Sequence, residues 1–443
     1  MKTSKVQFTG IEEKLKIRDY AGAISQIESA KDKYYKPKEK VVYYLDLGML
    51  YHYHKEYAKS NEFLSKAEKA IEELYTKSIS RAAASLLLND NVLEYAGEDY
   101  EDIYLNIFKA LNYIELDLFD DAFVEIRRIN NKLSMLEDKH TKIADQFNLS
   151  KDKKVDFKAG KNKFHNSALG RYLSLLLYRA EGKLDDARID KNKIAEAWDL
   201  QSQIYNFPKI QFDNYLERTN KTRIDVLSFI GKSPDKKANT LYIHTEKDLI
   251  VIARTEENPR GKQKIEDFNV IPWKGIEEGY HFKFQLPKMN LRSSCIAKVK
   301  VVVDNRIAGE LKIIESIENV ALETYKIKEP IIYLKTITRA IVKGLFAEKR
   351  KQEMEAKINN NILGFAARLA TDALVDATEN ADLRISRFFP SKALIKELLV
   401  EPGIHHIKIE YYSDNNTLLF TDDLGEKEFK ADKLNLLESY YLD

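Results

Sequence analysis

Residues 44–67 read YLDLGMLYHYHKEYAKSNEFLSKA and contain the clearest pair of helical patterns in the sequence. Each half carries side chains at the three- and four-residue spacing of a helix face, first Tyr44, Leu47, Gly48 and Tyr51 and then Tyr57, Ser60, Leu64 and Ala67. Because Gly48 has no side chain, the second helix can approach the first closely at that point. We therefore expect two helices that pack against each other.

This spacing is that of a tetratricopeptide repeat, a helix pair that stacks on further pairs. The second-helix pattern, an aromatic residue or leucine with alanine three positions later, recurs as Tyr20 with Ala23, Phe119 with Ala122 and Leu184 with Ala187. The units are more widely spaced than the ~34 residues of a regular array, so we expect insertions between them. Residues 89–101 predict a structured loop before a helix, and the lysine-rich residues 151–163 predict an exposed, mobile loop.

Beyond residue 229 the apolar pattern changes to a period of two. Strands are expected at 241–244, 249–253, 280–286, 299–303, 393–399, 404–412 and 418–421. Helical spacing returns between about residues 317 and 377, with helices around 331–346 and 362–374. The sequence thus predicts an α+β chain. Residues 1–230 form an N-terminal tetratricopeptide-like α-solenoid, and residues 231–443 form a β-sandwich-like domain with a helical insertion at about 317–380.

The composition of the chain excludes several classes of function. The 443 residues include 72 Lys and Arg against 70 Asp and Glu, and a net charge of +2 does not steer a chain to nucleic acid. Cys295 is the only cysteine, which excludes an internal disulfide framework and a multi-cysteine zinc site. It lies in the alternating run 294–299, so we expect a buried core thiol. No apolar stretch approaches the ~20 residues that span a bilayer.

The sequence motifs of catalysis and of cofactor binding fail when each is tested. Residues 231–233 (GKS) imitate the end of a phosphate-binding loop, but the glycine required before them is missing. His52 and His54 point to different faces of a helix, and the adjacent His405 and His406 diverge on a strand. We therefore expect no catalytic residue, no metal ligand and no cofactor, with His405 in a packing or hydrogen-bonding role.

The carboxylates of the segment Asp90–Asp102 allow two interpretations. The structural one is a solvated loop followed by the acidic first turn of a helix, where negative charge interacts favourably with the helix dipole. The alternative is a glycan- or cell-wall-processing enzyme that uses two of these carboxylates, with aromatic side chains contacting the sugar. Glutamine at Glu98 and at Glu101 would separate the two interpretations.

A helical array without catalytic motifs favours a non-enzymatic scaffold that binds a protein or peptide in its concave face. First-helix positions face the concavity of such arrays, and alternate helices supply charge. Arg127 and Arg128 would present guanidinium groups to a carboxylate-bearing partner. A third interpretation is a structural envelope protein that assembles with itself. The residues expected to bind the partner are Asn106, Tyr113, Arg127, Arg171 and Tyr178.

Several short segments occur together in this sequence: NDNV at 89–92, YAGEDYE at 95–101, ALNY at 110–113, DAFVEIRR at 121–128, Arg339-Ala340 with Lys343, ADLR at 381–384, FP at 389–390 and PGIH at 402–405. Their order and combination resemble one bacterial family, the tetratricopeptide-repeat cell-envelope lipoproteins of largely unassigned function. Within them we expect Asp382 and Arg384 to form an ion pair or a junction contact.

The resemblance implies a helical repeat region, a β-rich region and a role in envelope or peptidoglycan assembly, with an envelope-assembly protein as the partner. Members of the family carry a signal peptide that ends in a lipidated cysteine, and the sequence given has neither. The expected location is therefore periplasmic or outer-membrane-associated through a removed anchor, or cytoplasmic if the chain is complete as given. Contact with a membrane is expected only through such an anchor.

Overall fold

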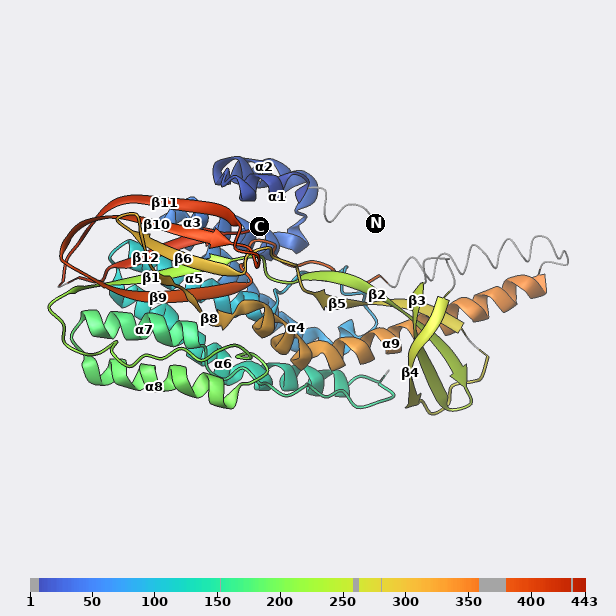
Figure 1. The fold of residues 1–443 in the computed structure, drawn as a ribbon. Helices are drawn as coiled ribbons and strands as arrows, with labels where there is room; N and C mark the ends of the chain where they lie inside the picture. The colour runs from blue at the N-terminus through green and yellow to red at the C-terminus, as the bar shows by residue number, and fades with distance from the viewer. Residues whose placement is uncertain (1–7, 152, 258–262, 280, 358–379, 432) are drawn as a thin grey trace.

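The computed structural model describes residues 8–151, 153–257, 263–279, 281–357, 380–431 and 433–443, and it has a mixed α+β fold (Figure 1). The first part is helical: α1 (Ile11–Lys16), α2 (Tyr20–Tyr34), a 3₁₀ turn (Pro37–Glu39), α3 (Lys40–Tyr53), α4 (Tyr57–Ser85), α5 (Asp99–Glu115), α6 (Phe119–Asn148), α7 (Ala168–Ala180) and α8 (Leu184–Leu200). In the described ranges, three sheets and one long helix follow. The predicted α+β class is confirmed.

Helices α3 to α8 pack as three successive pairs, α3 with α4, α5 with α6 and α7 with α8. The close approach predicted at Gly48 is confirmed, because a Cβ atom at Gly48 would lie only 2.5 Å from Cδ2 of Leu64 on α4. The Ser60 hydroxyl also donates a hydrogen bond to the Gly48 carbonyl at 2.7 Å. The spacing of residues 44–67 therefore does produce two tightly packed helices.

Sheet A contains four strands in the order β12 (Leu436–Tyr441), β1 (Thr222–Ile230), β9 (Lys392–Val400) and β8 (Lys312–Ser316). Strand β1 pairs in parallel with β12 and antiparallel with β9. The predicted boundary after residue 230 therefore separates β1 from its own sheet, and the helical part ends at Leu200 instead. Both faces of β1 are buried, so its sequence lacks the polar alternation that marks a half-exposed strand.

Sheet C contains β11 (Leu418–Phe429), β10 (Gly403–Tyr412), β6 (Lys298–Val303) and β7 (Arg306–Glu310) in that order. It faces sheet A across a shared apolar core that includes Val226 and Leu394 of sheet A and Val301 and Ile409 of sheet C. The strands predicted in these parts of the sequence are confirmed.

Sheet A lies between sheet C and the helices (Figure 1). Neighbouring residues of β1 point to opposite faces of a strand. Val226 therefore joins the core between the sheets, whereas Leu227 and Phe229 join the core formed with the helices. One apolar core thus spans the helical part and sheet A.

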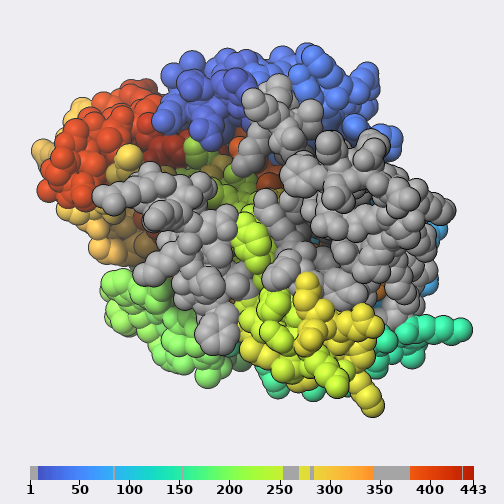
Figure 2. All heavy atoms as spheres, turned by 90° about the vertical axis from the view of Figure 1, so that its right-hand side faces the viewer, coloured from blue at the N-terminus to red at the C-terminus, as the bar shows by residue number. Residues whose placement is uncertain are grey.

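Sheet B contains β4 (Gln263–Pro272), β3 (Leu249–Glu257), β2 (Asp235–Glu246) and β5 (His281–Asn290). Ile337 and Ile341 of α9 (Ile317–Lys357) pack against its Ile243 and Phe284. Sheet B and the C-terminal part of α9 project from the body of the molecule (Figure 1). Figure 2 views the molecule from that end, with sheet B in lime and yellow at the front. The first predicted insertion helix is confirmed as α9, and the second, around 362–374, lies outside the described residues.

Two local predictions are wrong. Cys295 is exposed, because the chain has not yet entered β6 at that position. In the lysine-rich loop 151–163, Phe157 is only 2% exposed, and its ring lies 5.3 Å from that of Phe147 on α6. Gly160 donates a backbone hydrogen bond to Ile327 of α9 at 2.7 Å. This part of the loop is packed rather than free.

Candidate functional site

The helix face predicted to bind a partner is covered by sheet A of the same chain and by the residues just before β9. Tyr53 on α3 donates a hydrogen bond to the Phe388 carbonyl at 2.8 Å, and the ring of Phe108 on α5 lies 5.1 Å from that of Phe229 on β1. Burial of this apolar face is favourable because it leaves water. In the part of the chain that the structure describes, sheet A therefore occupies the face of the first helices that was expected to bind a partner.

The five residues predicted to bind a partner do not form one site. Asn106 is fully buried and donates hydrogen bonds to the carboxylates of Glu68 at 2.8 Å and Glu125 at 2.5 Å, so it cannot reach a partner. Arg171 pairs with Asp190 on the neighbouring helix α8 at 3.0 Å. Both side chains therefore connect helices within the array.

The other three predicted residues lie on α5, α6 and α7. The Tyr178 ring packs on that of Phe123, with the ring centroids 4.7 Å apart. Tyr113 is half-buried. Of the five residues, Arg127 is the one that the structure places fully on the surface.

Glu68 is the centre of a buried charge network between α4, α5 and α6. Its carboxylate lies 2.8 Å from Lys109, 2.9 Å from Arg128 and 2.9 Å from Lys132. Burial would raise the pKa of Glu68, but Lys132 and Lys109 outweigh it and hold that pKa well below its usual value. Arg128, predicted to face a partner, thus pairs with a carboxylate of its own chain.

A cavity of about 310 Å³ lies where α4, α5, α6 and α9 meet β2, β5 and the segment before β9. We call it the junction cavity. Residues from 90–99 and from 382–384 line it, so two of the segments that resemble the lipoprotein family meet there. Part of its wall is apolar and is formed by Ile71, Leu74, Ile143, Phe147 and Ile331.

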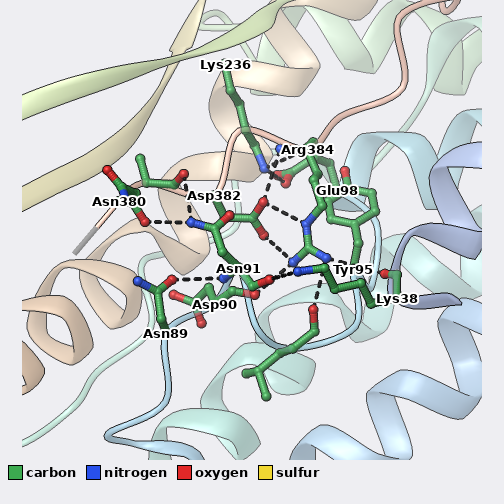
Figure 3. Close-up of polar contacts among 12 residues, drawn as sticks. Lys38, Asn89, Asp90, Asn91, Tyr95, Glu98, Lys236, Asn380, Asp382 and Arg384 are labelled. Carbon is green, nitrogen blue, oxygen red and sulfur yellow. Dashed lines mark hydrogen bonds and ion pairs between the residues drawn. The ribbon is translucent and has the colours of Figure 1, made fainter. Parts of the chain in front are cut away.

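Arg384 holds these two segments together (Figure 3). Its guanidinium donates to the Asp382 carboxylate at 2.8 Å and to the backbone carbonyls of Asp90 at 2.8 Å and Leu93 at 2.9 Å. It also lies 5.4 Å from the centre of the Tyr95 ring. The predicted ion pair of Asp382 with Arg384 is confirmed, and the planar fork of arginine suits this set of acceptors better than lysine would.

Asn91 makes a second connection between the same segments (Figure 3). Its side-chain amide donates to the carbonyls of Asn380 at 2.7 Å and Ala381 at 3.1 Å. Its backbone N–H donates to the Asn89 side chain at 2.9 Å, and Lys38 donates to its carbonyl. The loop after α4 is therefore fixed at several points.

Helix α9 reaches this loop through two buried cations. The ammonium of Lys335 lies 2.6 Å from the Asp90 carboxylate, and the guanidinium of Arg339 donates to the Leu88 carbonyl at 2.9 Å. Lys335 and Arg339 are 6% and 2% exposed. Each buried cation thus has an acceptor in this loop, which offsets the cost of burying its charge.

Glu98 occupies the N-cap position of α5 in the lining of the junction cavity. Its carboxylate pairs with Lys236 of β2 and, at 2.6 Å, with Lys328 of α9. Burial would lower the pKa of Lys328, but the carboxylates of Glu98 and Asp99 outweigh it and raise that pKa, which keeps the ammonium charged. Three separate elements therefore supply this group of charges.

Asp99 lies next to Glu98 and pairs with two basic residues of α6. Its carboxylate is 2.9 Å from Lys139 and 2.7 Å from His140. Burial would raise the pKa of Asp99, but His140 and Lys139 outweigh it and hold the pKa well below its usual value. Asp99 therefore stays ionised at neutral pH.

Glu101, three residues after Glu98 on α5, is fully buried and does not line the cavity. Its carboxylate accepts hydrogen bonds from the Tyr95 hydroxyl at 2.7 Å, the Glu98 backbone N–H at 2.7 Å and the Ser386 backbone N–H at 2.6 Å. Burial raises the pKa of Glu101 to about 7. The predicted acidic first turn of a helix is confirmed, but a solvated setting is wrong for these two glutamates, and they do not form an accessible acid–base pair.

The lining of the junction cavity carries more positive than negative charge. Its seven Lys and Arg residues are Lys77, Arg81, Lys139, Lys236, Lys328, Lys335 and Arg384. Its five Asp and Glu residues are Asp90, Glu94, Glu98, Asp99 and Asp382. The charges of the whole chain nearly balance, so this surplus is a local property. A concave site with charged groups and an apolar wall has the general character of a ligand-binding site.

Sequence reasoning misses the basic half of this site. The sequence pattern around these lysines is that of an ordinary helix or strand, in which lysine is commonly a solvated surface residue. The residues concerned are Lys139, Lys236 and Lys328. No spacing connects them to Glu98, because the residues come from different parts of the chain. The density of carboxylates around residue 98 was the available signal, together with the pair Asp382 and Arg384.

In comparisons with known proteins, no family model matches this chain, and no curated protein or solved structure matches it. Within the described ranges, no helix is both long and apolar enough to cross a membrane. In the same ranges, no group of three or more His, Cys, Asp and Glu side chains is arranged to hold a metal ion.

Proposed function

We propose that this chain is a non-enzymatic binding scaffold of the bacterial cell envelope that takes up a segment of a protein partner in the junction cavity. In this proposal the helix pairs α3–α4, α5–α6 and α7–α8 form a tetratricopeptide-like array, and sheets A and C form a β-sandwich-like unit. The succession of pairs and the close contact at Gly48 support the array. The assignment to the envelope rests on the resemblance of 89–101 and 381–384 to the lipoprotein family.

One observation carries the choice of binding surface. The junction cavity is a hollow assembled from several elements, and exposed side chains such as Lys77 and Arg81 contribute to its lining. The concave side of the helical array, in contrast, is packed against sheet A. Binding pockets occur preferentially where structural units meet. A partner held there would contact the helical array and sheet B together with α9.

The proposal is tested by placing a photocrosslinking phenylalanine analogue at single positions and irradiating cells that produce the protein. Tyr75 is the test position, because it is half-buried, aromatic and part of the cavity lining. Ile189 on α8 is the matched control, because it is 57% exposed and lies away from the cavity. We expect one discrete crosslinked partner from position 75 and none from position 189.

Equal crosslinking from both positions, or none from position 75, would contradict the cavity as the binding surface. A product that contains only copies of this chain would favour the self-assembling structural protein. The glycan-processing alternative predicts loss of function in both Glu98→Gln and Glu101→Gln. Under the proposal, Glu101→Gln leaves partner binding intact, since Glu101 does not line the cavity.

A further inference from the structure

We infer that the junction cavity binds a carboxylate of a peptide, flanked by apolar side chains. This inference rests on the proposed binding role of the cavity and names the chemistry of the partner segment. It follows from the charges in the lining, from the exposed guanidinium of Arg81 at the edge and from the apolar part of the wall.

The charges around Glu98 and Asp99 leave hydrogen-bond donors for a ligand. Each lysine ammonium has three N–H donors. Lys139 makes its ion pair with Asp99 alone and Lys328 with Glu98 alone within the described part of the chain. The side chain of Lys139 is 22% exposed and that of Lys328 is 16% exposed, so a ligand in the cavity can reach both. An incoming carboxylate would meet these remaining donors.

Arg81 adds a guanidinium for which the described residues provide no hydrogen-bond or ion-pair partner. It lies on α4, lines the cavity and is exposed. Among the residues that the structure describes, it forms no hydrogen bond or ion pair. Guanidinium groups bind carboxylates through two parallel hydrogen bonds. Arg81 is thus suited to hold an anionic group as it enters the cavity.

The remainder of the lining favours a peptide over a long acyl chain. The apolar wall around Ile71, Leu74 and Phe147 can accept one or two apolar side chains. Asp90, Glu94 and Asp382 lie in the same lining, and their carboxylates can accept hydrogen bonds from peptide N–H groups. A hydrocarbon chain would offer these carboxylates no hydrogen-bond donor and would displace water from them, which is unfavourable.

The test uses a set of N-acetylated tripeptides with varied apolar residues, each prepared as the free acid and as the C-terminal amide. Decanoate serves as the acyl-chain probe. Binding to the whole chain is measured by calorimetry at low and high salt. We expect acids to bind at least about tenfold more tightly than their amides, as removal of a charge-assisted hydrogen bond implies. Higher salt should weaken the acids but not the amides.

Variants identify the side chains that bind the carboxylate. Lys328→Met should reduce the difference between acid and amide, while Glu98 keeps its contact with Lys236. Arg81→Ala should do the same, and because Arg81 is exposed on α4 this variant is expected to fold as the wild type does. Lys142→Met on α6 is the matched control, because Lys142 is 54% exposed, pairs with Asp138 and does not line the cavity.

Equal affinity of acids and amides, or unchanged preference in both Lys328→Met and Arg81→Ala, would overturn the inference. Tighter binding of decanoate than of any peptide acid would overturn the assignment to a peptide. The crosslinking experiment at position 75 tests the proposed function separately. If a partner is captured there but acids and amides bind equally, the cavity remains a binding site and only the carboxylate assignment fails.

Discussion

Asp46 on α3 is fully buried, and three hydrogen-bond donors converge on its carboxylate. The Tyr35 hydroxyl donates at 2.8 Å, the Ser386 hydroxyl at 2.9 Å and the Arg387 backbone N–H at 3.3 Å. Burial raises the pKa of Asp46 to about 7 in spite of these hydrogen bonds. This single side chain therefore connects the helical part to the segment before β9 and makes that connection sensitive to pH.

Asp46→Asn tests this effect. A carboxyl whose pKa is raised in the folded state binds its proton more tightly there, so its stabilising effect is largest below the unfolded pKa near 3.8 and is lost as pH rises through about 7. Relative to the wild type, the asparagine variant should gain about 2–3 kcal/mol in free energy of unfolding between pH 5 and pH 8. Urea unfolding at the two pH values measures this gain.

Asp138→Asn provides the control, because Asp138 is 57% exposed on α6. Its difference from the wild type should stay the same at both pH values. If the stability of Asp46→Asn follows that of the wild type across this range, the raised pKa is wrong.

Among the contacts between secondary-structure elements, the packing of α3 against α4 depends on Gly48. A Cβ atom at this position would lie 2.5 Å from one atom of the Leu64 side chain and 3.3 Å from the Leu64 backbone nitrogen. Leu64 is fully buried, so it has little room to move. The helices would have to separate, and the hydrogen bond from Ser60 to the Gly48 carbonyl would lengthen.

Gly48→Ala should therefore destabilise the protein by about 1–3 kcal/mol, although alanine favours the helical state more than glycine does. Chemical denaturation followed by circular dichroism at a helical wavelength measures the loss. The control is Gly170→Ala on α7, where the nearest atom, Ser167 Oγ, lies at 3.4 Å in ordinary contact. That variant should be neutral or slightly more stable, and an equal loss in both would argue against the tight contact at Gly48.

Over the whole molecule, the helices and sheet A share one core, so they are expected to unfold together. Phe229 of β1 is fully buried in that core against Phe108 of α5. Tyr172 of α7 donates to Asp225 of the same strand at 3.0 Å. Separation of the two parts would expose these aromatic side chains to water.

Phe229→Ala should lower the free energy of unfolding by about 3–5 kcal/mol, as is usual for a large aromatic side chain removed from a core. Hydrogen exchange monitored by mass spectrometry should show the same loss of protection in α5, α7 and β12. A loss confined to the strands, with α5 and α7 protected as before, would mean that the helical part is stable independently of sheet A.

The sequence predicts those features that depend on neighbours along the chain. The helix spacing of 44–67, the glycine contact at residue 48 and the alternating strands of sheet C are of this kind. The boundary after residue 230 is wrong because β1 is buried on both faces and lacks a polar side. The predicted burial of Cys295 is wrong because the alternating pattern begins before β6 itself does.

Local patterns were enough to predict the mixed α+β class, the close helix contact at Gly48 and the pairing of Asp382 with Arg384, because each depends on residues that are neighbours or that recur at a regular period. The covering of the first helices by sheet A and the contacts of Lys236 and Lys328 with Glu98 are seen only in the folded chain. These contacts join segments far apart in the chain. Their geometry follows from how whole elements pack, and no local pattern of residues records it.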